Sequence, residues 1–385
     1  MLLKTTKYFF GILCIVICGC TNPIEQTETS LTSLKTDSTI KYAKRFSIAQ
    51  NENFTIVYLF GNKSNFDTTA TYLIYKDSSN LKNTPNHCIL VKSPSKKIAA
   101  LSSIYANMFC ELGLINNLIA IDNLDYINNP EIISKCNSKQ IKEIAKGLEI
   151  DLEQTVKLNP DVIFTFGMRD PKKDINPKLQ LTKIPVAISL DHLEETPLAR
   201  AEWIKFFAAF VNKKELADSI FKTVEKNYNE LKLIAFKSEK KPTVFNEIKY
   251  SDSWYMPGGK SYVSKLLTDA GANYLWKEDG NYGSLPLSFE QVYAKAKDAD
   301  YWINVSTLKT KKDLLAFDTR YAEFNAFKKG TIFNNTKTTN AKGYSNYWET
   351  GMIFPDRILN DLLLIFHPEL KDKIKNELYY YEQLK

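Results

Sequence analysis

IDLEQTVKLNPDVIFTFG, residues 150–167, and LSFEQVYAKAKDADYWINVS, residues 287–306, follow one pattern. Each stretch begins as an amphipathic helix and ends in a short apolar run, residues 162–166 and 301–305. These runs are rich in aromatic and β-branched residues and have the length of buried parallel strands. A chain that repeats a helix and a strand in this way is expected to fold into two lobes of one design.

A capping signal marks the start of each helix in these stretches. Asp151 and Ser288 are suitable N-cap residues, and Gln154 and Gln291 follow them at the three-residue spacing of a capping box. Such a box satisfies helix N–H groups that otherwise have no partner. Both helices are therefore predicted to begin at equivalent positions.

The likeness continues upstream of both stretches. SSIYANMFCELG, from Ser102 to Gly113, and SYVSKLLTDAG, from Ser261 to Gly271, each read as a helix ended by glycine. A helix, a strand, another helix and another strand therefore occur twice in the same order. This alternation favours an α/β fold with two Rossmann-like lobes built on parallel sheets. Parallel strands are predicted at residues 97–102, 119–122 and 243–248.

The first twenty residues have the composition of a targeting segment. Lys4 and Lys7 are followed by an apolar run, residues 8–18, that is too short to span a bilayer as a helix. Gly19 and Cys20 complete a segment that resembles a lipoprotein signal peptide, in which Cys20 is the acylated residue. An ordinary cleaved signal or an N-terminal anchor is the alternative, and every one of these interpretations predicts an exported protein.

Two further segments precede the first lobe. Residues 21–41 are rich in Thr, Ser, Asn and Glu and hold few large apolar side chains, which predicts a flexible tether. The pattern then changes to short alternating strands at residues 54–60, 72–75 and 88–91. These strands predict a small antiparallel N-terminal extension.

The middle of the chain is predicted to be helical. Thr196 and Pro197 are suited to N-cap and first-turn positions, and apolar residues recur every three or four positions over residues 213–237. At 1.5 Å per residue this second helix is about 36 Å long, which suits a rigid strut between two lobes. The chain is predicted to divide into a leader at 1–20, a tether at 21–41, an N-terminal lobe at 42–195, connecting helices at 196–238 and a C-terminal lobe at 239–385. Within the C-terminal lobe, a loop is predicted at 249–260 and helices at 356–366 and 371–384.

Composition argues against several classes of function. The net charge of +7 comes from 51 basic and 44 acidic residues spread along the chain, which does not indicate nucleic-acid binding. Three distant histidines offer no metal site, and no nucleophile motif or carboxylate pair indicates an enzyme. MPGGKS, residues 256–261, fails as a phosphate-binding loop because Trp254 stands where that motif needs glycine. Cys88, Cys110 and Cys136 allow at most one disulfide among them.

Aromatic and small polar residues gather at the predicted strand ends. YSDSWY, residues 250–255, follows one strand, and GYSNYWE, residues 343–349, occupies another loop. Ligands of open α/β sheets bind beyond the carboxyl ends of the strands, and Tyr and Trp present flat faces to bulky organic ligands. Each aromatic alone is more often a packing residue, so the prediction rests on the cluster. The predicted ligand-binding residues are Ser102, Tyr105, Tyr126, Tyr250, Trp254, Gly258, Gly259, Tyr262, Tyr344, Tyr347 and Trp348.

Residues 96–368 resemble class III periplasmic binding proteins of ABC importers, which carry cobalamin, iron siderophores or haem. The resemblance rests on the order of KKIAALSS, the helix ending in ELG, IDLEQTVKLNPDVIF, the long central helix, WYMPGGKSYVSKLLTDAGANYLW and SFEQVYAKAKDADYWI. It implies two lobes joined by a rigid backbone helix, with a ligand held between them and no covalent chemistry. It also implies a monomer, attached to the cell envelope by its lipid anchor alone, that serves an ABC permease and its ATPase.

In that family one surface glutamate on each lobe docks on arginines of the permease. Glu153 and Glu290 match these positions, so the resemblance implies that they are docking residues. Both also lie in the first turn of a predicted helix, where the helix dipole stabilises a carboxylate. A purely structural role is therefore the alternative.

The resemblance leaves the ligand open. Zinc- and manganese-binding members of the wider superfamily use several histidines with a carboxylate, which this chain does not supply. A ferric siderophore is the leading expectation, with Arg169, Lys146 and Lys260 as cations for an anionic one. Haem or a corrinoid held by aromatic rings is also expected to fit, and no other cofactor is predicted. The alternative functions are a surface lipoprotein that binds or assembles without transport, and an exported hydrolase.

Overall fold

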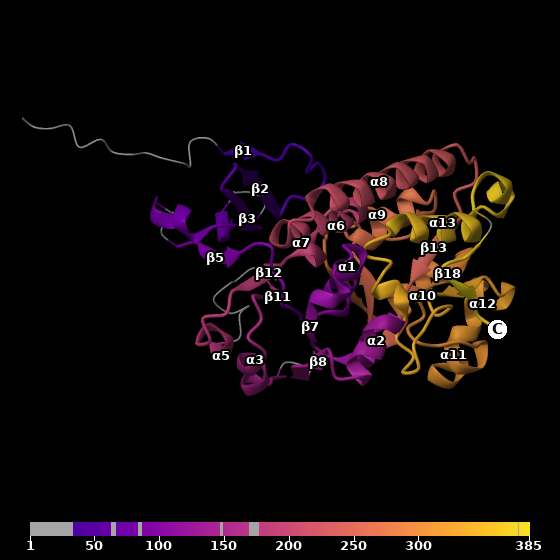
Figure 1. Ribbon diagram of the computed structural model, residues 1–385. Helices are drawn as coiled ribbons and strands as arrows, with labels where there is room; N and C mark the ends of the chain where they lie inside the picture. Colours follow the sequence, from indigo (N-terminus) through magenta and orange to yellow (C-terminus); the bar gives the residue numbers. More distant parts are fainter. Residues whose placement is uncertain (1–33, 63–66, 84–86, 147–148, 169–176, 376) are drawn as a thin grey trace, which may run out of the picture. The chain divides into compact units, whose positions relative to one another are not determined.

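Two parallel sheets, one in each half of the chain, form the framework of the fold (Figure 1). The computed structural model describes residues 34–62, 67–83, 87–146, 149–168, 177–375 and 377–385, which belong to one compact unit, Leu34–Lys385. The first sheet has the order β12-β11-β6-β7-β8, and all its pairings are parallel. Its strands are β6 (Ile98–Ala100), β7 (Leu118–Ile121), β8 (Lys142–Glu143), β11 (Val162–Phe166) and β12 (Val186–Ser189).

The second sheet has the order β16-β13-β18-β19-β20, and only its edge strand β20 runs antiparallel. In both sheets the first strand, β6 or β13, lies between the second strand and the strand that follows the repeated helix. The prediction of two α/β lobes of one design is therefore confirmed. The strands are β13 (Thr243–Asn246), β16 (Asn273–Tyr274), β18 (Tyr301–Ile303), β19 (Ile332–Asn334) and β20 (Glu382–Gln383).

Helices flank both sheets and connect the two halves (Figure 1). The first half holds α1 (Ser103–Glu111), α2 (Pro130–Asn137), α3 (Leu152–Leu158) and α5 (Pro177–Gln180), followed by α6 (Pro197–Ala201), α7 (Ile204–Val211) and α8 (Lys214–Phe236). The second half holds α9 (Tyr262–Asp269), α10 (Phe289–Ala296), α11 (Lys311–Phe317), α12 (Asn325–Lys329) and α13 (Pro355–Phe366). No helix in the described part of the chain is long and apolar enough to span a membrane.

The repeated helices α3 and α10 begin where the capping signals predict. Ser288 and Gln291 form a complete capping box at the start of α10. At α3 only half of the box forms, because Asp151 accepts from the Gln154 N–H while the Gln154 amide donates to the Glu143 carbonyl at 3.3 Å. The first repeat therefore uses its glutamine to tie the helix to β8.

The predicted glycines end α1 and α9. Gly113 and Gly271 have φ values of 71° and 74°, in the left-handed region that glycine adopts without strain. At Gly271 an added Cβ would also lie 3.0 Å from the Ala235 carbonyl oxygen of α8. This glycine therefore both stops α9 and lets it approach the long helix.

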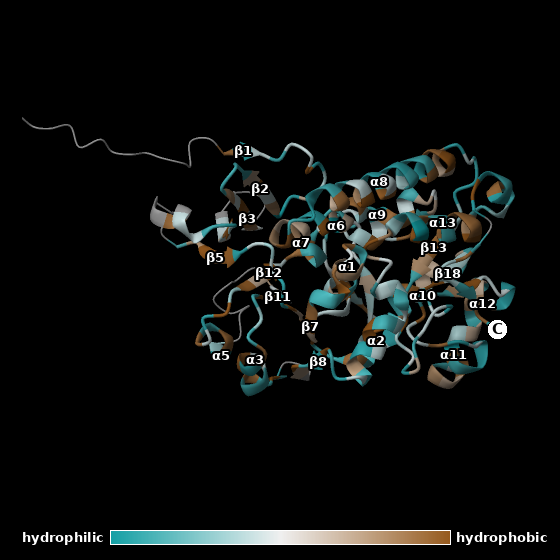
Figure 2. Ribbon diagram, in the orientation of Figure 1, coloured by the Kyte–Doolittle hydropathy of each residue, from teal (hydrophilic) through white to brown (hydrophobic). Residues whose placement is uncertain are grey.

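The central helical region differs from the prediction in one respect. The helix that starts after Thr196 breaks near Glu202 into α6 and α7, and the aromatic residues of α7 and its start are fully buried in the main core. The long helix, α8, spans 23 residues within the predicted range 213–237 and packs against α6, α7, α9 and α13. Hydrophobic and hydrophilic residues share its surface (Figure 2), as expected for a helix with one buried stripe.

The N-terminal extension is a five-stranded sheet in the order β1-β2-β3-β4-β5. Strands β3 and β4 pair antiparallel as predicted, and β1 and β2, which were not predicted, continue the antiparallel pairing. The third predicted strand, β5, pairs parallel to β4 instead. One face, including Val57 and Leu59, joins the main core, whereas Phe54 and Ile56 form a separate cluster on the other face. The strands are β1 (Lys35–Thr36), β2 (Phe46–Gln50), β3 (Phe54–Asn62), β4 (Asp67–Tyr75) and β5 (Ile89–Lys92).

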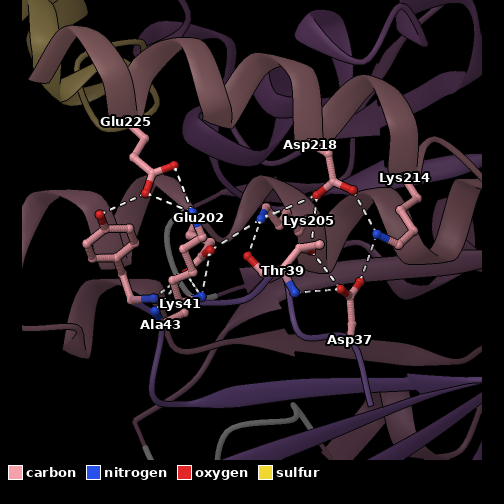
Figure 3. Close-up of polar contacts among 10 residues, drawn as sticks. Asp37, Thr39, Lys41, Ala43, Glu202, Lys205, Lys214, Asp218 and Glu225 are labelled. Carbon is pink, nitrogen blue, oxygen red and sulfur yellow. Dashed lines mark hydrogen bonds and ion pairs between the residues drawn. The ribbon is translucent and has the colours of Figure 1, made fainter. Parts of the chain in front are cut away.

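A buried carboxylate fastens the segment between β1 and β2 to the central helices (Figure 3). Glu202, which is fully buried, accepts hydrogen bonds from the backbone N–H groups of Lys41, Tyr42 and Ala43 at 2.7–3.0 Å. The Lys205 ammonium lies 3.3 Å from the same carboxylate and neutralises it. We call residues 37–43 the strap.

A second group of charges fastens the start of the strap to α8 (Figure 3). Lys214 contacts Asp37 at 3.0 Å and Asp218 at 2.7 Å, and Thr39 donates to both aspartates. Residues 34–41, the described part of the predicted tether, are therefore held against the fold rather than free.

Two other segments differ from the prediction. The predicted loop at residues 249–260 is a hairpin that extends into a three-stranded antiparallel sheet. Of the predicted helix at residues 371–384, only residues 371–373 are helical, as the end of a 3-10 helix, Pro368–Lys373. Asp361 accepts the backbone N–H groups of Tyr379, Tyr380 and Tyr381, which holds the chain extended before β20. The short strands not yet named are β9 (Ala145–Lys146), β10 (Glu149–Ile150), β14 (Lys249–Tyr250), β15 (Ser253–Pro257) and β17 (Ser284–Leu287).

Candidate ligand-binding site

Loops from the two lobes meet beyond the carboxyl ends of the strands. The side-chain amide of Asn340 donates to the Ile127 carbonyl at 2.9 Å. Glu349, which is buried, accepts from the Asn128 N–H at 2.8 Å and from the Asn107 side-chain amide. The loop after β19 therefore lies against the loop after β7.

Predicted aromatic residues come together at this junction. The rings of Tyr126 and Tyr344, one from each lobe, meet edge to face with their centres 4.6 Å apart. Their side chains are 40% and 43% exposed, and Trp348 nearby in the sequence is 49% exposed. These three residues combine exposed ring faces with polar tips, as the sequence predicts for a ligand-binding surface.

The backbone at the carboxyl edge of the second sheet is tightly turned. Glu247 directly follows β13 with φ 65°, and Asn304 directly follows β18 with φ 57°. The indole N–H of Trp254 donates to the Asn246 carbonyl at 2.9 Å, and that of Trp302 donates to the Glu247 carbonyl at 2.7 Å. Left-handed non-glycine residues held in place by packing are characteristic of functional sites.

Three polar side chains at this edge lack partners. The buried Asn246 amide makes no hydrogen bond with either of its side-chain atoms, and the buried Tyr262 hydroxyl makes none. The Glu247 carboxylate has no hydrogen bond or ion pair with any described residue, and burial raises its pKa to about 7. Leaving a polar group unsatisfied costs about 1–3 kcal/mol only where water cannot reach it, which applies here to the Asn246 amide and the Tyr262 hydroxyl. Glu247 is partly exposed, so water can hydrate its carboxylate. We call Asn246, Glu247 and Tyr262 the unpaired triplet.

Two members of the unpaired triplet, Glu247 and Tyr262, lie near the buried side chain of Tyr347. Burial raises the pKa of Tyr347 far above its ordinary value, and nearby Tyr262 and Glu247 raise it further. Its hydroxyl hydrogen-bonds Tyr381, which in turn donates to Asn304 at 2.8 Å. Tyr347, Tyr381 and Asn304 therefore form a hydrogen-bonded network next to members of the unpaired triplet, which have no hydrogen bond of their own.

A cluster of hydrogen-bonded polar side chains from the first lobe lies beside Tyr262. Asp191, which is buried, accepts from the Tyr105 hydroxyl at 2.9 Å and the Ser189 hydroxyl at 2.8 Å. Arg200 donates to the other Asp191 oxygen at 3.2 Å, and its guanidinium carbon lies 5.6 Å from the centre of the Tyr262 ring. This cluster contacts the Tyr262 ring through Arg200 but makes no hydrogen bond with the Tyr262 hydroxyl.

Three predicted ligand residues belong to the core instead. Tyr105, Trp254 and Tyr347 are 2%, 0% and 1% exposed, so they present no surface to a ligand. Each uses its polar tip within the protein, as described above. The prediction that these three side chains contact a ligand is therefore corrected: they pack in the core beneath the candidate site.

Gly258 and Gly259 are also structural. A Cβ added at either position would collide with the backbone carbonyl oxygens of Asn281 or Asp279. The Gly258 N–H donates to the Gly283 carbonyl at 2.9 Å. The prediction that this turn offers its N–H groups to a ligand is corrected, because close packing against the following loop requires the glycines and uses a donor.

The remaining predicted residues differ in their exposure, and some lie outside the described residues. Tyr250 is 75% exposed at the tip of the hairpin, and Ser102 is the partly exposed N-cap of α1 without a side-chain capping bond. The Lys260 ammonium lies 5.4 Å from the centre of the Tyr282 ring. The predictions for Arg169, the Lys146 side chain and Cys20 lie outside the described residues.

Sequence reasoning missed Asn246, Glu247, Asn304 and Arg200. A usable signal exists for the first three, because Asn246 ends the buried strand β13 and Glu247 follows it, in the sequence VFNE, and Asn304 follows β18 in the sequence WIN. Polar residues at that position point beyond the carboxyl edge of a sheet, where ligands bind. Arg200 lies in a helix and gives no such signal.

Comparison with known proteins agrees with this architecture. The profile of the family described as periplasmic binding proteins matches residues 98–338. The chain belongs to this family. The periplasmic binding protein fold thus accounts for both lobes and the long helix, whereas the N-terminal extension precedes the matched region.

Two relatives of this periplasmic binding protein are uncharacterized lipoproteins of Methanocaldococcus jannaschii. The first is 32% identical over 239 residues, which cover 59% of this chain and 55% of the relative. The second is 26% identical over 307 residues, which cover 76% of this chain and 75% of the relative. The match thus spans about half the length of the first relative.

Solved periplasmic binding proteins share the fold. A possible iron-binding (periplasmic solute-binding) protein from Staphylococcus epidermidis has a TM-score of 0.54 and 16% identity, with 71% of this chain and 99% of that chain covered. A periplasmic heme-binding protein from Roseiflexus sp. RS-1 has a TM-score of 0.52 and 17% identity, with 71% and 98% covered. The resemblance to class III periplasmic binding proteins is confirmed.

The two glutamates implied as docking residues of a periplasmic binding protein are both on the surface. Glu153 is exposed in the first turn of α3. Glu290 is 74% exposed in the first turn of α10 and lies 3.3 Å from Arg320, which also contacts Asp318 at 2.7 Å. Neither position distinguishes a docking role from a helix-start role.

Other features of this periplasmic binding protein carry no assigned function. A cavity of about 860 Å³ lies between α8, α13 and the C-terminal segment, where Asp356 accepts from Asn227 at 3.0 Å. Within the described ranges no group of three or more His, Cys, Asp or Glu residues is placed to hold a metal ion. Cys88, Cys110 and Cys136 are free thiols.

Proposed function

We propose that this chain is the lipid-anchored ligand-binding subunit of an ABC importer and that it captures a metal chelate between its two lobes. The unpaired triplet beyond the carboxyl edge of the second sheet supports this proposal most strongly. A ligand at this edge can pair with the partly exposed Glu247 carboxylate, which has no partner among the described residues. No covalent chemistry is needed for this role.

The ligand class follows from the exposed aromatic residues. Tyr126, Tyr344 and Trp348 offer ring faces to an organic chelator, and the partly exposed Glu247 offers a hydrogen-bond acceptor. Two solved structures with this fold carry the names iron-binding and heme-binding protein, which supports a metal chelate. A ferric siderophore is the leading candidate, with haem or cobalamin as the other two classes.

The proposed anchor is the acylated Cys20, which would attach the protein to the cell envelope. Two relatives carry the name lipoprotein, which supports this assignment. The described unit begins at Leu34, so the anchor and the binding site are separable in an experiment.

The binding proposal is tested with a form that begins at Leu34. Ferric siderophores, haem and cobalamin are titrated while tryptophan fluorescence and the melting temperature are recorded. At a ligand concentration of 100 times Kd, binding is expected to stabilise the protein by about 2.7 kcal/mol. If none of the three classes changes fluorescence or melting, the chelate proposal is wrong and a lipoprotein without transport function is favoured.

The docking proposal is tested by charge reversal. Glu153→Lys combined with Glu290→Lys is expected to abolish uptake of the bound chelate because both permease contacts become repulsive. Chelate affinity, measured with the same purified variants, is expected to stay within twofold of the original. Glu230→Lys, a reversal on the exposed side of α8, is the matched control. Reduced chelate affinity would instead place the two glutamates in the binding site.

A further inference from the structure

Asn340 connects the two lobes with one end of its side chain and its own loop with the other. Its amide nitrogen donates across the junction to the Asp125 and Ile127 carbonyls, at 2.8 and 2.9 Å. Its amide oxygen accepts from the Lys342 and Tyr344 N–H groups of its own loop, at 3.0 and 3.1 Å. The loop is therefore held in shape by the same residue that fastens it to the first lobe.

Glu349 makes a second connection between the lobes. It is 1% exposed, and its two oxygens accept from the first lobe, one from the Asn128 N–H at 2.8 Å and the other from the Asn107 side-chain amide. Asn107 in turn accepts from the Asn129 side-chain amide at 3.2 Å. We call Asn340 and Glu349 the latch.

The junction also buries polar atoms that it does not pair. The side-chain nitrogen of Asn128 and one carboxylate oxygen of Asp122 are buried without a hydrogen-bond partner among the described residues. Separation of the loops would expose both atoms to water, which supplies the missing partners. The hydrogen bonds of the latch favour a closed arrangement and these two atoms favour an open one, so both arrangements are expected to be accessible.

The closed latch also brings together two side chains that are proposed to bind the ligand. The rings of Tyr126 and Tyr344 lie beside the latch contacts and meet edge to face, with their centres 4.6 Å apart. A ligand ring cannot lie between them while they touch each other. Entry of a ligand between these rings therefore requires the two loops to part.

We propose that residues 338–350 form a gate, which the latch holds against residues 122–129, and that this gate opens to admit the ligand and closes again over it. The inference rests on the proposed function, because it describes how the same site is opened. Entry and release both require the open arrangement, so the latch slows both steps.

Asn340→Asp weakens the latch while it preserves the loop. The aspartate keeps an acceptor for the loop N–H groups, but it replaces the donor with an oxygen that faces the Asp125 and Ile127 carbonyls. The N–H of Asn128, which Glu349 accepts in the closed gate, reports the opening directly. In the ligand-free form that begins at Leu34, hydrogen exchange at this N–H is expected to become at least tenfold faster.

Asn346→Asp is the matched control for this variant. The Asn346 amide oxygen accepts from the N–H and the hydroxyl of Thr350, which belongs to the same loop. The same chemical change there leaves the contacts between the lobes intact. Exchange at the Asn128 N–H is expected to stay within twofold of the original in this control.

Binding kinetics test whether the latch controls access. Haem, cyanocobalamin and ferrioxamine B are the probes, and for each one that binds, Asn340→Asp is expected to raise the association and dissociation rates by similar factors of at least threefold. Kd changes little because the latch is lost from the free and the bound protein alike. Unchanged exchange at the Asn128 N–H, or faster exchange with unchanged binding rates, would overturn the gate.

The two measurements separate the gate from the proposed function. Binding of a probe with unaltered kinetics leaves the proposed function in place and removes the gate. If none of the three probes binds, the proposed function fails and the gate has no ligand to admit, so both are wrong. Faster exchange at the Asn128 N–H would then show only a contact between the lobes.

Discussion

Glu202→Ala is expected to lower the free energy of unfolding by about 3 to 5 kcal/mol, the range measured when one partner of a buried ion pair is removed. The variant leaves three backbone N–H groups of the strap without their acceptor. It also leaves Lys205, which is 7% exposed, without its most buried counter-charge. Equilibrium unfolding in urea measures the loss, and limited proteolysis is expected to show cleavage within residues 37–43.

Glu225→Ala is the matched control for this experiment. Glu225 also contacts the strap, through Lys41 at 3.2 Å and the Tyr42 hydroxyl at 2.9 Å, but its ion pair is on the surface (Figure 3). Ion pairs on the surface contribute little to the free energy of unfolding, so this variant is expected to be about as stable as the original protein. Equal losses for the two variants would contradict the special role of Glu202.

Glu247→Gln is expected to stabilise the ligand-free protein at pH 8. The folded state holds the Glu247 proton up to a pKa of about 7, whereas the unfolded state releases it near 4.5. Between these values the folded state binds more protons, so the original protein loses stability as pH rises through this window. Glutamine does not titrate. The advantage of the variant is therefore expected to grow by about 2–3 kcal/mol between pH 4 and pH 8.

Urea unfolding of both proteins at several pH values measures this difference. Tyr274 and Tyr347 remain neutral over the whole range because their pKa values lie far above 10, so they do not contribute to it. Parallel pH profiles for the two proteins would contradict the unpaired state of Glu247.

Local patterns predicted most of the framework because short-range physics controls it. The caps at Asp151 and Ser288 and the stops at Gly113 and Gly271 depend on neighbours within a few residues, and the structure places them as expected. The apolar runs that became β11 and β18 are likewise self-contained. The duplicated topology follows once these elements are in order.

Features that depend on distant contacts were not predictable. Glu202 reads as an ordinary helix residue, yet it is buried because a segment about 160 residues earlier supplies three N–H groups. The segment before β20 has a helical pattern, but Asp361 holds it extended. Trp254 and Tyr105 have the composition of ligand residues, and only the packing around them shows that they are core.

The candidate site shows the same division. Tyr126, Tyr344 and Trp348 were predictable as a cluster because exposed aromatics in loops after strands share one edge. The partner state of Glu247 was not, because the absence of a counter-charge is a property of the assembled site. The sequence therefore predicts a candidate site at this edge, and the structure shows which of its side chains are exposed and which are paired.

Hydrogen exchange, recorded with and without a saturating chelate, tests the central claim most directly. The account predicts slower exchange in peptides that cover residues 244–262 and 338–350 of the second lobe together with residues 122–129 of the first. Peptides that cover α8 are expected to remain unchanged. Protection confined to α8 and α13, or no protection with any chelate that binds, would contradict a ligand held where the strand ends of the two lobes meet.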